Sequence, residues 1–500
     1  MAIEPSPKQK GVIWAGTDDG NVQLTTDGGK TWTNFRGKIP GLPLGAWIPQ
    51  IRASRYNAGE VFVIANDYRR GDFKPYIFRT TDFGKTWTRI VDEKKVVGYA
   101  LCLQQDPVEP NLIFVGTEQG LWVSFDNGTT YQQFKNGYPS VSTYDMAIQE
   151  READLVIATF GRALWVLDDI RPLRKLAANK GQLFSNKITA FEAPLAYQSK
   201  TKNASGIEYS IWGSYEGENR KRGAELSFYI NKTATDTGKN KLADTVQVKI
   251  YDANNVAVRN LRIKADSGFN RFYWGMEGKG IRQSGGFRGG GGGRFGGGAG
   301  MNEPGGLPVD PGNYKVVLTL GKGQMDSMLV VVNDDPNAPT SKEVRDAIRK
   351  ANDRLDKSAL KLTDLTDRLT ESEEVIRKVE AGFPNMDKKD ADTLRKIGKQ
   401  MSDSIKAIRE QLNGKPQEKQ GYGNVPQLTV NSVMGEARSY LGSKNVAPGA
   451  QEERLMADAE SMVADVLKRA NNFFDLRWKQ YKSLAEAAPV KLFKEYKPIE

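Results

Sequence analysis

Residues 25–32 read TTDGGKTW, and this pattern returns twice farther along the chain. Residues 80–87 read TTDFGKTW and residues 124–131 read SFDNGTTY, which gives the template Thr/Ser-x-Asp-x-Gly-x-Thr-Trp/Tyr. The copies begin about 55 and then about 44 residues apart, and each follows an apolar stretch. Propeller blades of four short strands repeat at about 40 to 50 residues. The repeat therefore predicts β-propeller blades in the N-terminal third of the chain.

Each position of the repeat suits a tight turn between two strands. The Asp carboxylate can accept backbone N–H bonds across the turn, and Gly supplies the positive φ that such a turn needs. The aromatic ring can pack between neighbouring sheets. We therefore assign nine repeat residues to folding: Asp27, Gly29, Trp32, Asp82, Gly84, Trp87, Asp126, Gly128 and Tyr131.

The 500 residues are enough for several independent cores, and we predict a multidomain chain that is mainly β and then α. Residues 1–175 are expected to form propeller blades in an incomplete ring, and residues 176–196 a linker. Alternating apolar and polar residues predict an Ig-like β-sandwich over residues 197–335. Apolar residues at a spacing of three and four predict an antiparallel helical bundle over residues 340–490. An intermolecular coiled coil is the alternative for these helices, but Gly and Pro interruptions favour the compact bundle.

The composition restricts the possible chemistry. The chain has no histidine, which excludes Ser/His and Cys/His nucleophile pairs and the usual zinc sites. Its single cysteine, Cys102, lies between Leu101 and Leu103 and is predicted to be a small buried residue of a strand. No run of about 18 apolar residues predicts a membrane span. Any catalysis would have to rest on carboxylates, Tyr, Lys or Arg.

The net charge of +11 is not gathered into a basic stripe that would fit nucleic acid. Residues 285–306 are so rich in Gly that we expect a loop without a fixed structure inside the sandwich. Phe287, Arg288, Arg294 and Phe295 in this loop resemble an RGG-type RNA-binding tract. The tract is single and short, so we expect no nucleic-acid partner.

Candidate ligand-binding residues lie in the turns and the insertion of the blade region. The insertion at residues 67–76 is polar and aromatic, and loops of this kind often bind ligands. The candidates for binding are Asp18, Asp19, Asp67, Arg69, Glu118 and Arg162. The carboxylates that could serve a hydrolase are Asp18, Asp19, Asp67, Asp72, Glu118, Asp168 and Asp169. No spacing singles out a pair among them, and each could equally cap a turn.

A metal site or a cofactor is not expected. Asp18, Asp19 and Asn21 offer the oxygen ligands that calcium accepts, but their spacing is not that of a calcium-binding loop.

The chain resembles bacterial secreted or envelope proteins with sortilin-like, Asp-box (BNR) propellers, which are often labelled glycosyl-hydrolase-like. The resemblance rests on the three repeats and on residues 16–21, 116–120, 158–162 and 165–169. The family commonly has His where this chain has Phe160, so a role for that histidine is lost here.

Residues 257–261, 268–274 and 311–314 are similar to the Ig-like module of flagellar hook-capping proteins and secretion-sorted bacterial proteins. The resemblance implies that this module is a structural or docking unit. It also implies a secreted, periplasmic or cell-surface location.

The Asp-box family's propellers usually hold more blades upstream, so the chain resembles a C-terminal portion. Partner blades or self-association would then complete the ring.

Two functions follow from the resemblance and remain open at the level of sequence. The first is binding of a protein, peptide or glycan at the propeller face, as sortilin-like propellers do. The alternative is a glycoside hydrolase acting on polysaccharide. Such an enzyme needs two carboxylates, about 5 Å apart for retention or roughly 6.5 to 9.5 Å apart for inversion. We expect those carboxylates to lie mostly in blades that this chain lacks.

Overall fold

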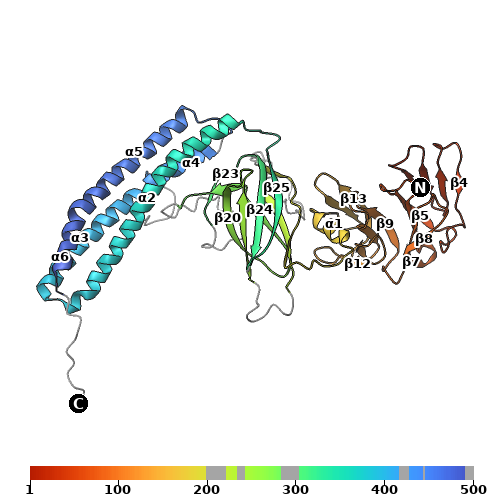
Figure 1. Cartoon of the computed structure of the whole chain (residues 1–500), viewed down its shortest axis with the longest axis horizontal. Helices are drawn as coiled ribbons and strands as arrows, with labels where there is room; N and C mark the ends of the chain where they lie inside the picture. Colours follow the sequence, from red (N-terminus) through yellow and green to blue (C-terminus); the bar gives the residue numbers. More distant parts are fainter. Residues whose placement is uncertain are drawn as a thin grey trace, which may run out of the picture.

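The structure is a computed structural model, and it consists mostly of antiparallel sheets followed by C-terminal helices (Figure 1). It describes residues 1–198, 221–232, 243–282, 303–321, 323–415, 427–442 and 445–489. The sheets of the N-terminal third lie at one end of the molecule, the sheets of β16 to β25 lie in the middle, and the helices form the other end.

The N-terminal region forms four consecutive antiparallel sheets, each a meander in chain order, as propeller blades are. Sheet 1 contains β1 (Ala2–Pro5), β2 (Ile13–Gly16), β3 (Val22–Thr25) and β4 (Thr33–Asn34). Sheet 2 contains β5 (Trp47–Ala53), β6 (Val61–Asp67), β7 (Asp72–Thr80) and β8 (Thr88–Val91), with a 3-10 turn, η1 (Tyr68–Arg70), between β6 and β7. Sheet 3 contains β9 (Ala100–Gln105), β10 (Ile113–Thr117), β11 (Gly120–Ser124) and β12 (Gln132–Gln133). Sheet 4 contains β13 (Thr143–Gln149), β14 (Asp154–Thr159) and β15 (Leu164–Leu167).

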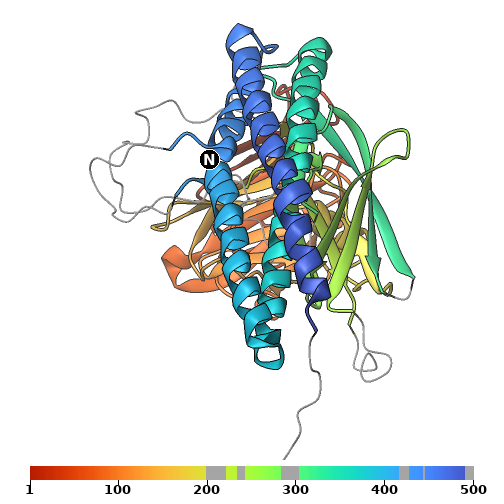
Figure 2. The ribbon, with the colours of Figure 1, turned by 90° about the vertical axis from the view of Figure 1, so that its left-hand side faces the viewer.

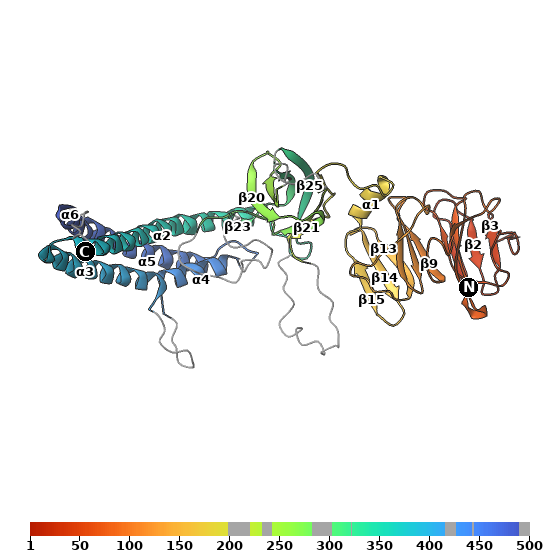
Figure 3. The same cartoon turned by 90° about the horizontal axis from the view of Figure 1, so that it is seen from below.

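The N-terminal sheets follow one another in a row (Figure 3). Apolar side chains fill the spaces between successive sheets. In β6, Val61 and Val63 belong to the core shared with sheet 1, whereas Phe62 and Ile64 belong to the core shared with sheet 3. Successive side chains of a strand point to opposite faces, so a strand buried on both faces has to be apolar throughout. This explains why the middle strands of sheets 2 and 3 lack the polar alternation of a half-exposed strand.

The first strands of the four sheets converge. The Gln50 side-chain amide in β5 donates to Asp145 in β13 at 3.1 Å, and its carbonyl accepts from the Leu103 backbone N–H in β9 at 2.7 Å. The Ala53 backbone N–H is 3.4 Å from a carboxylate oxygen of Glu4 in β1. Because strands of sheets 2 and 4 touch across sheet 3, the row of sheets curves around a common inner edge.

The repeated turns join the third and fourth strands of sheets 1 to 3. Asp27 accepts from the Thr31 backbone N–H at 3.0 Å and from its hydroxyl at 2.6 Å. Asp82 makes the same two bonds with Thr86, at 2.9 and 2.6 Å. Asp126 does so with Thr130, at 2.8 and 2.6 Å. The glycines of these turns have positive φ values: Gly29, Gly84 and Gly128.

The aromatic residues of the repeats do not share one environment. Trp87 contacts Trp14 and Phe35 of sheet 1, at ring-centroid distances of 6.0 and 5.8 Å. Tyr131 packs against the core between sheets 2 and 3. The expectation that Trp32 packs between sheets is wrong, since its side chain is 44% exposed. The equivalent rings pack on the preceding sheet, and among the described residues no sheet precedes sheet 1.

Residues 176–196 are not the linker expected from sequence. They contain the end of α1 (Arg171–Ala178) and all of β16 (Ile188–Ala190), whose residues are buried. β16 pairs antiparallel with β18 (Ala224–Ile230), so the next core begins at residue 188 and not at residue 197. The apolar side chains of β16 face this core, which holds the segment in place.

Two sheets enclose the second core. One has the order β16-β18-β21, and the other has the order β17-β25-β24-β19-β20, in which only β17 and β25 pair in parallel. A small sheet, β22-β23, lies beside them. The remaining bounds are β17 (Ala196–Gln198), β19 (Thr245–Tyr251), β20 (Ala257–Lys264), β21 (Gly268–Trp274), β22 (Glu277–Lys279), β23 (Gly305–Pro308), β24 (Gly312–Leu320) and β25 (Gln324–Asp334).

Most of the Gly-rich segment 285–306 lies outside the described residues, together with its Phe and Arg side chains. Its last two glycines, Gly305 and Gly306, belong to β23 and are not part of a loop.

The C-terminal helices lie side by side (Figure 2). Their facing sides share one apolar core, built mainly by leucine, alanine, valine, isoleucine and methionine. One chain supplies all the helices around this core, whereas an intermolecular coiled coil would need helices from a second chain. The elements are α2 (Lys342–Gly382), η4 (Phe383–Asn385), α3 (Lys388–Asn413), α4 (Val430–Gly442), α5 (Ala450–Asn472), a π-helical turn η5 (Phe473–Trp478) and α6 (Lys479–Ala487).

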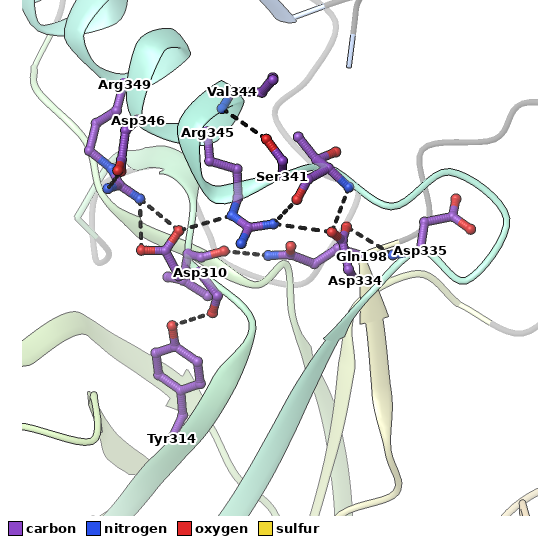
Figure 4. A network of polar contacts seen from close by, with 12 residues as sticks. Gln198, Asp310, Tyr314, Asp334, Asp335, Ser341, Val344, Arg345, Asp346 and Arg349 are labelled. Atoms are coloured by element: carbon purple, nitrogen blue, oxygen red, sulfur yellow. Dashed lines mark hydrogen bonds and ion pairs between the residues drawn. The ribbon is translucent and has the colours of Figure 1, made fainter. Parts of the chain in front are cut away.

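Ion pairs join the start of α2 to the sheets before it (Figure 4). Arg349 donates to both carboxylate oxygens of Asp310 at 2.9 Å. Arg345 reaches Asp334 at 3.1 Å and Asp310 at 3.3 Å. Ser341 caps the helix by accepting from the Val344 N–H at 3.4 Å. The helix is therefore anchored to β25 and to the turn before β24.

Replacing both Arg345 and Arg349 by alanine should loosen this junction without unfolding the chain. Ion pairs that are partly exposed contribute about 0.2 to 1 kcal/mol each, so the loss of two such pairs should make local opening about twofold to thirtyfold more frequent. Hydrogen exchange of peptides covering residues 334–349 measures the change. Arg368→Ala removes an exposed ion pair with Asp364 farther along α2 and serves as the control. Unchanged exchange in the double variant would contradict the anchoring role.

Candidate functional site

The two ends of the N-terminal sheets carry different kinds of loop. In a four-stranded meander, the turn between the second and third strands lies at the same end as the start of the first strand. The turn between the third and fourth strands lies at the opposite end. The repeated Asp turns are of the latter kind, so they are separated from the β2–β3, β6–β7, β10–β11 and β14–β15 turns. Most of the predicted binding residues lie on the second set of turns.

Four aromatic rings gather at the end that carries these turns. We call Trp47, Tyr68, Phe73 and Tyr99 the aromatic platform. Tyr68 stacks on Tyr99 with ring centroids 4.9 Å apart and an interplanar angle of 16°. Trp47 meets Tyr68 edge-on at 6.4 Å, and Phe73 lies 6.2 Å from Tyr99. The rings come from the starts of β5 and β9 and from the β6–β7 insertion, so sheets 2 and 3 build the platform together.

Arg69 lies over the platform. Its guanidinium carbon is 4.8 Å from the Trp47 ring centroid, within the range of a cation–π contact. Its Nε lies 3.4 Å from the Tyr68 hydroxyl, and this hydrogen bond is the main cause that raises the pKa of Arg69. The charges of Asp18 and Tyr144 act in the same direction.

Glu118 flanks the platform from sheet 3. Its backbone N–H donates to the Tyr99 carbonyl at 3.2 Å. Burial raises the pKa of the Tyr99 hydroxyl, and the Glu118 carboxylate, Tyr68 and Tyr144 add to the rise. Tyr99 therefore stays a neutral phenol that can donate a hydrogen bond throughout the physiological range of pH.

The structure brings only part of the predicted binding set together. Arg69 lies over the platform and Glu118 is bonded to the Tyr99 backbone, whereas Asp18 lies in the β2–β3 turn at the same end of the sheets. Asp19 instead holds its own turn, where it accepts from Thr17 and from the Asn21 amide at 2.9 Å, and the bond from Thr17 lowers the pKa of its carboxyl.

Asp67 and Arg162 also lack a direct place on the platform. Asp67 is buried and receives two bonds from Arg70, at 2.7 and 2.8 Å. Arg70 in turn donates to the Leu44 carbonyl at 2.6 Å, so Asp67 fixes the base of the insertion. Arg162 lies in the β14–β15 turn, where its carbonyl accepts from the Trp165 indole at 3.0 Å.

The remaining candidate carboxylates have structural partners. Asp72 accepts from the Tyr76 hydroxyl at 2.8 Å. Asp169 is buried beside Arg171 at 2.7 Å, and burial is the largest influence on its carboxyl, raising the pKa. Asp168 lies beside it, and its carbonyl is 3.4 Å from Arg271.

Sequence reasoning missed the aromatic residues that make the platform. Residues 67–76 pointed to the insertion, but Trp47 and Tyr99 carried no motif. A second exposed pair, Tyr144 and Phe160, lies on sheet 4 with ring centroids 6.3 Å apart. Phe160 stands where the resembled family has His, and 75% of its surface is exposed. An aromatic residue in a turn, such as Phe160, was the one feature of the sequence that could have pointed to aromatic binding residues at this end of the sheets.

Cys102 is buried in β9, as predicted, and burial raises the pKa of its thiol. Over the described ranges, no three Asp, Glu or Cys side chains gather as a metal site would require. None of the helices in the described part of the chain is long and apolar enough to cross a membrane.

Comparison with known proteins finds a partial relative. No family model matches the chain. The oligoxyloglucan-reducing end-specific xyloglucanase of Emericella nidulans is 32% identical over 111 residues, which is 21% of this chain and 13% of that protein. The chain thus aligns with only a small part of this relative's length.

Two solved structures also align with the chain. The GH74 xyloglucanase from Xanthomonas campestris is 13% identical, covers 65% of this chain and 44% of its own, and has a TM-score of 0.29. YCF48 from Cyanidioschyzon merolae is 16% identical, covers 54% of this chain and 84% of its own, and has a TM-score of 0.26.

Proposed function

We propose that the aromatic platform binds an oligosaccharide. The observation that carries this proposal is the stack of Tyr68 on Tyr99 beside Trp47, with Arg69 over the rings. A sugar ring presents a C–H face that packs on an aromatic face, and its hydroxyls need hydrogen-bond donors and acceptors at the rim. Ligand sites combine apolar surface with a few placed polar groups in this way.

The charges around the platform favour a neutral ligand. Asp18 and Glu118 are acidic and Arg69 and Arg162 are basic, so the turns at this end of the sheets carry both signs. A strongly charged peptide would meet groups of its own sign, whereas a neutral glycan can bond to either. The partial xyloglucanase relative adds support for β-glucan ligands. A protein or peptide ligand is the competing proposal.

Titration of the full chain with xyloglucan oligosaccharides by calorimetry tests the proposal. Tyr68→Ala and Tyr99→Ala should each weaken binding at least about tenfold, since truncating a central aromatic contact costs about 2 kcal/mol or more. Tyr197→Ala alters a partly exposed tyrosine of the second core and is the matched control. Absence of binding by the native chain at millimolar ligand, or equal affinity in all variants, would contradict the proposal.

A glycoside hydrolase is the second candidate, supported by the xyloglucanase activity of the partial relative. The candidate carboxylates are Glu118, whose backbone is bonded to Tyr99, and Asp18 in the β2–β3 turn at the same end of the sheets. Asp19 is a poor general acid because its lowered pKa keeps it ionised, and Asp169 is held by Arg171. Release of reducing ends from xyloglucan that Asp18→Asn or Glu118→Gln abolishes, with binding retained, would favour the enzyme.

We further propose that the sheets of residues 188–335 form an Ig-like module that acts as a structural or docking unit. The anchoring of α2 by Asp310 and Asp334 supports a rigid connection between this module and the helices. A secreted, periplasmic or cell-surface location is part of the same proposal, because an extracellular polysaccharide would be met there. Fractionation of cells that express the complete gene tests it.

A further inference from the structure

The outer side of sheet 4 is an unpartnered apolar surface. In β15, Trp165 and Leu167 pack toward sheet 3, whereas Leu164 and Val166 alternate with them and are 69% and 56% exposed. In β14, Ala158 pairs with Leu164 and Val156 pairs with Val166. We call the surface formed by these four residues the trailing face: Val156, Ala158, Leu164 and Val166.

Sheet 1 has a matching surface on its own outer side. Trp14 in β2 is fully buried toward sheet 2, so its neighbours Ile13 and Ala15 point the other way. Ile3 in β1 pairs with Ala15 and is 59% exposed. We call the surface formed by these residues and the exposed repeat tryptophan the leading face: Ile3, Ile13, Ala15 and Trp32.

Contacts within the chain show how the equivalent faces of sheets 2 and 3 pack on the sheet before them. Trp87 of sheet 2 packs on Trp14 and Phe35 of the preceding sheet. Tyr131 of sheet 3 lies in the core that contains Ile90 of sheet 2. Each repeat aromatic therefore packs on the side of the preceding sheet that faces its own sheet, which is the kind of surface that the trailing face of sheet 4 presents. Trp32 holds the same position in its repeat and has no such surface to pack on among the described residues.

We propose that two copies of this chain close a ring, with the leading face of each copy packed on the trailing face of the other. One copy supplies both halves of the contact, and a twofold axis forms the two interfaces at once. Four sheets from each copy give a ring of about eight, within the four to eight blades of propellers. Closure would cover two apolar surfaces of a kind that monomers rarely leave open.

The mass of the full chain in solution tests the ring. One chain has a mass of 55.4 kDa, so the native protein should give a single species of twice that mass by light scattering after gel filtration. Trp32→Glu and Val166→Lys should each halve the observed mass, because either change places a charge in both interfaces. Both side chains are exposed in one copy, so the variants should keep the native circular dichroism.

Val256→Lys provides the matched control, because Val256 is 58% exposed but lies in the β19–β20 turn, outside the sheets that carry the two faces. This variant should retain the native mass.

A one-to-one mixture of the two charged variants is the sharpest test. In a mixed pair, one interface keeps both native residues, and the other places the introduced carboxylate opposite the introduced ammonium group. The mixture should regain the doubled mass that each variant lacks alone. A monomeric native chain, open-ended larger species, or a mass that neither charged variant lowers would each overturn the two-copy ring. Failure of the mixture to reassociate would show that the two faces do not meet.

Discussion

Replacing Trp87 by alanine is expected to lower the free energy of unfolding of the N-terminal sheets by about 3 kcal/mol. The Trp87 ring fills the space between sheets 1 and 2, where it meets Trp14 and Phe35. Removing a buried Trp or Phe leaves a cavity and typically costs about 3 to 5 kcal/mol. The lower figure applies because Trp87 is only partly buried.

The chain has several cores, so a single melting curve does not isolate this effect. Hydrogen exchange of peptides from β2 and β6 reports the stability of the sheets themselves. Trp87→Phe keeps an aromatic ring at the interface and should cost less than half as much. Equal exchange in Trp87→Ala and the native chain would show that the interface between sheets 1 and 2 does not depend on this ring.

Acid should weaken the N-terminal sheets through the three repeated turns. Hydrogen bonds from the Thr86 hydroxyl and backbone lower the pKa of Asp82 to about 2, and bonds of the same kind lower the pKa of Asp27. At Asp126, burial opposes the fall, but hydrogen bonds led by that from Thr130 still leave the pKa below its ordinary value. A carboxyl with a lowered folded-state pKa stabilises the fold above its unfolded pKa.

This stabilisation is lost as the pH falls from about 4 through the folded-state pKa values. In the triple variant that combines Asp27→Asn, Asp82→Asn and Asp126→Asn, the sheets should be less stable at pH 5 and lose less between pH 5 and pH 2.5. Asn can still accept the backbone N–H bonds but carries no titrating charge. Thr86→Val removes the hydroxyl donor to Asp82 and should show a smaller effect of the same sign. An acid response identical to that of the native chain would contradict the assignment.

The repeats by themselves predict much of the β architecture. The Asp, Gly and Thr positions act within eight residues, so their hydrogen bonds depend only on local sequence. The long helices were also predictable, since the spacing of apolar residues sets one face of a helix. β16 was missed because three residues are too few to show a period, and its pairing partner lies about 40 residues away in β18.

The aromatic platform was beyond the reach of sequence for a different reason. Trp47, Tyr68 and Tyr99 come from three separate stretches, and only the packing of sheets 2 and 3 brings neighbouring rings to centroid distances of 6.4 and 4.9 Å. No spacing encodes that contact. The insertion could be suspected of binding, but its partners could not be named.

Trp32 and Trp87 show what the local sequence determines and what only the tertiary structure decides. Their eight-residue repeats, TTDGGKTW and TTDFGKTW, differ at one position, and the sequence determined the same turn for both. Tertiary structure alone decided that one ring is partly buried against a neighbouring sheet and the other is 44% exposed. A turn is fixed by hydrogen bonds among adjacent residues, whereas burial depends on whether a second sheet lies against the ring.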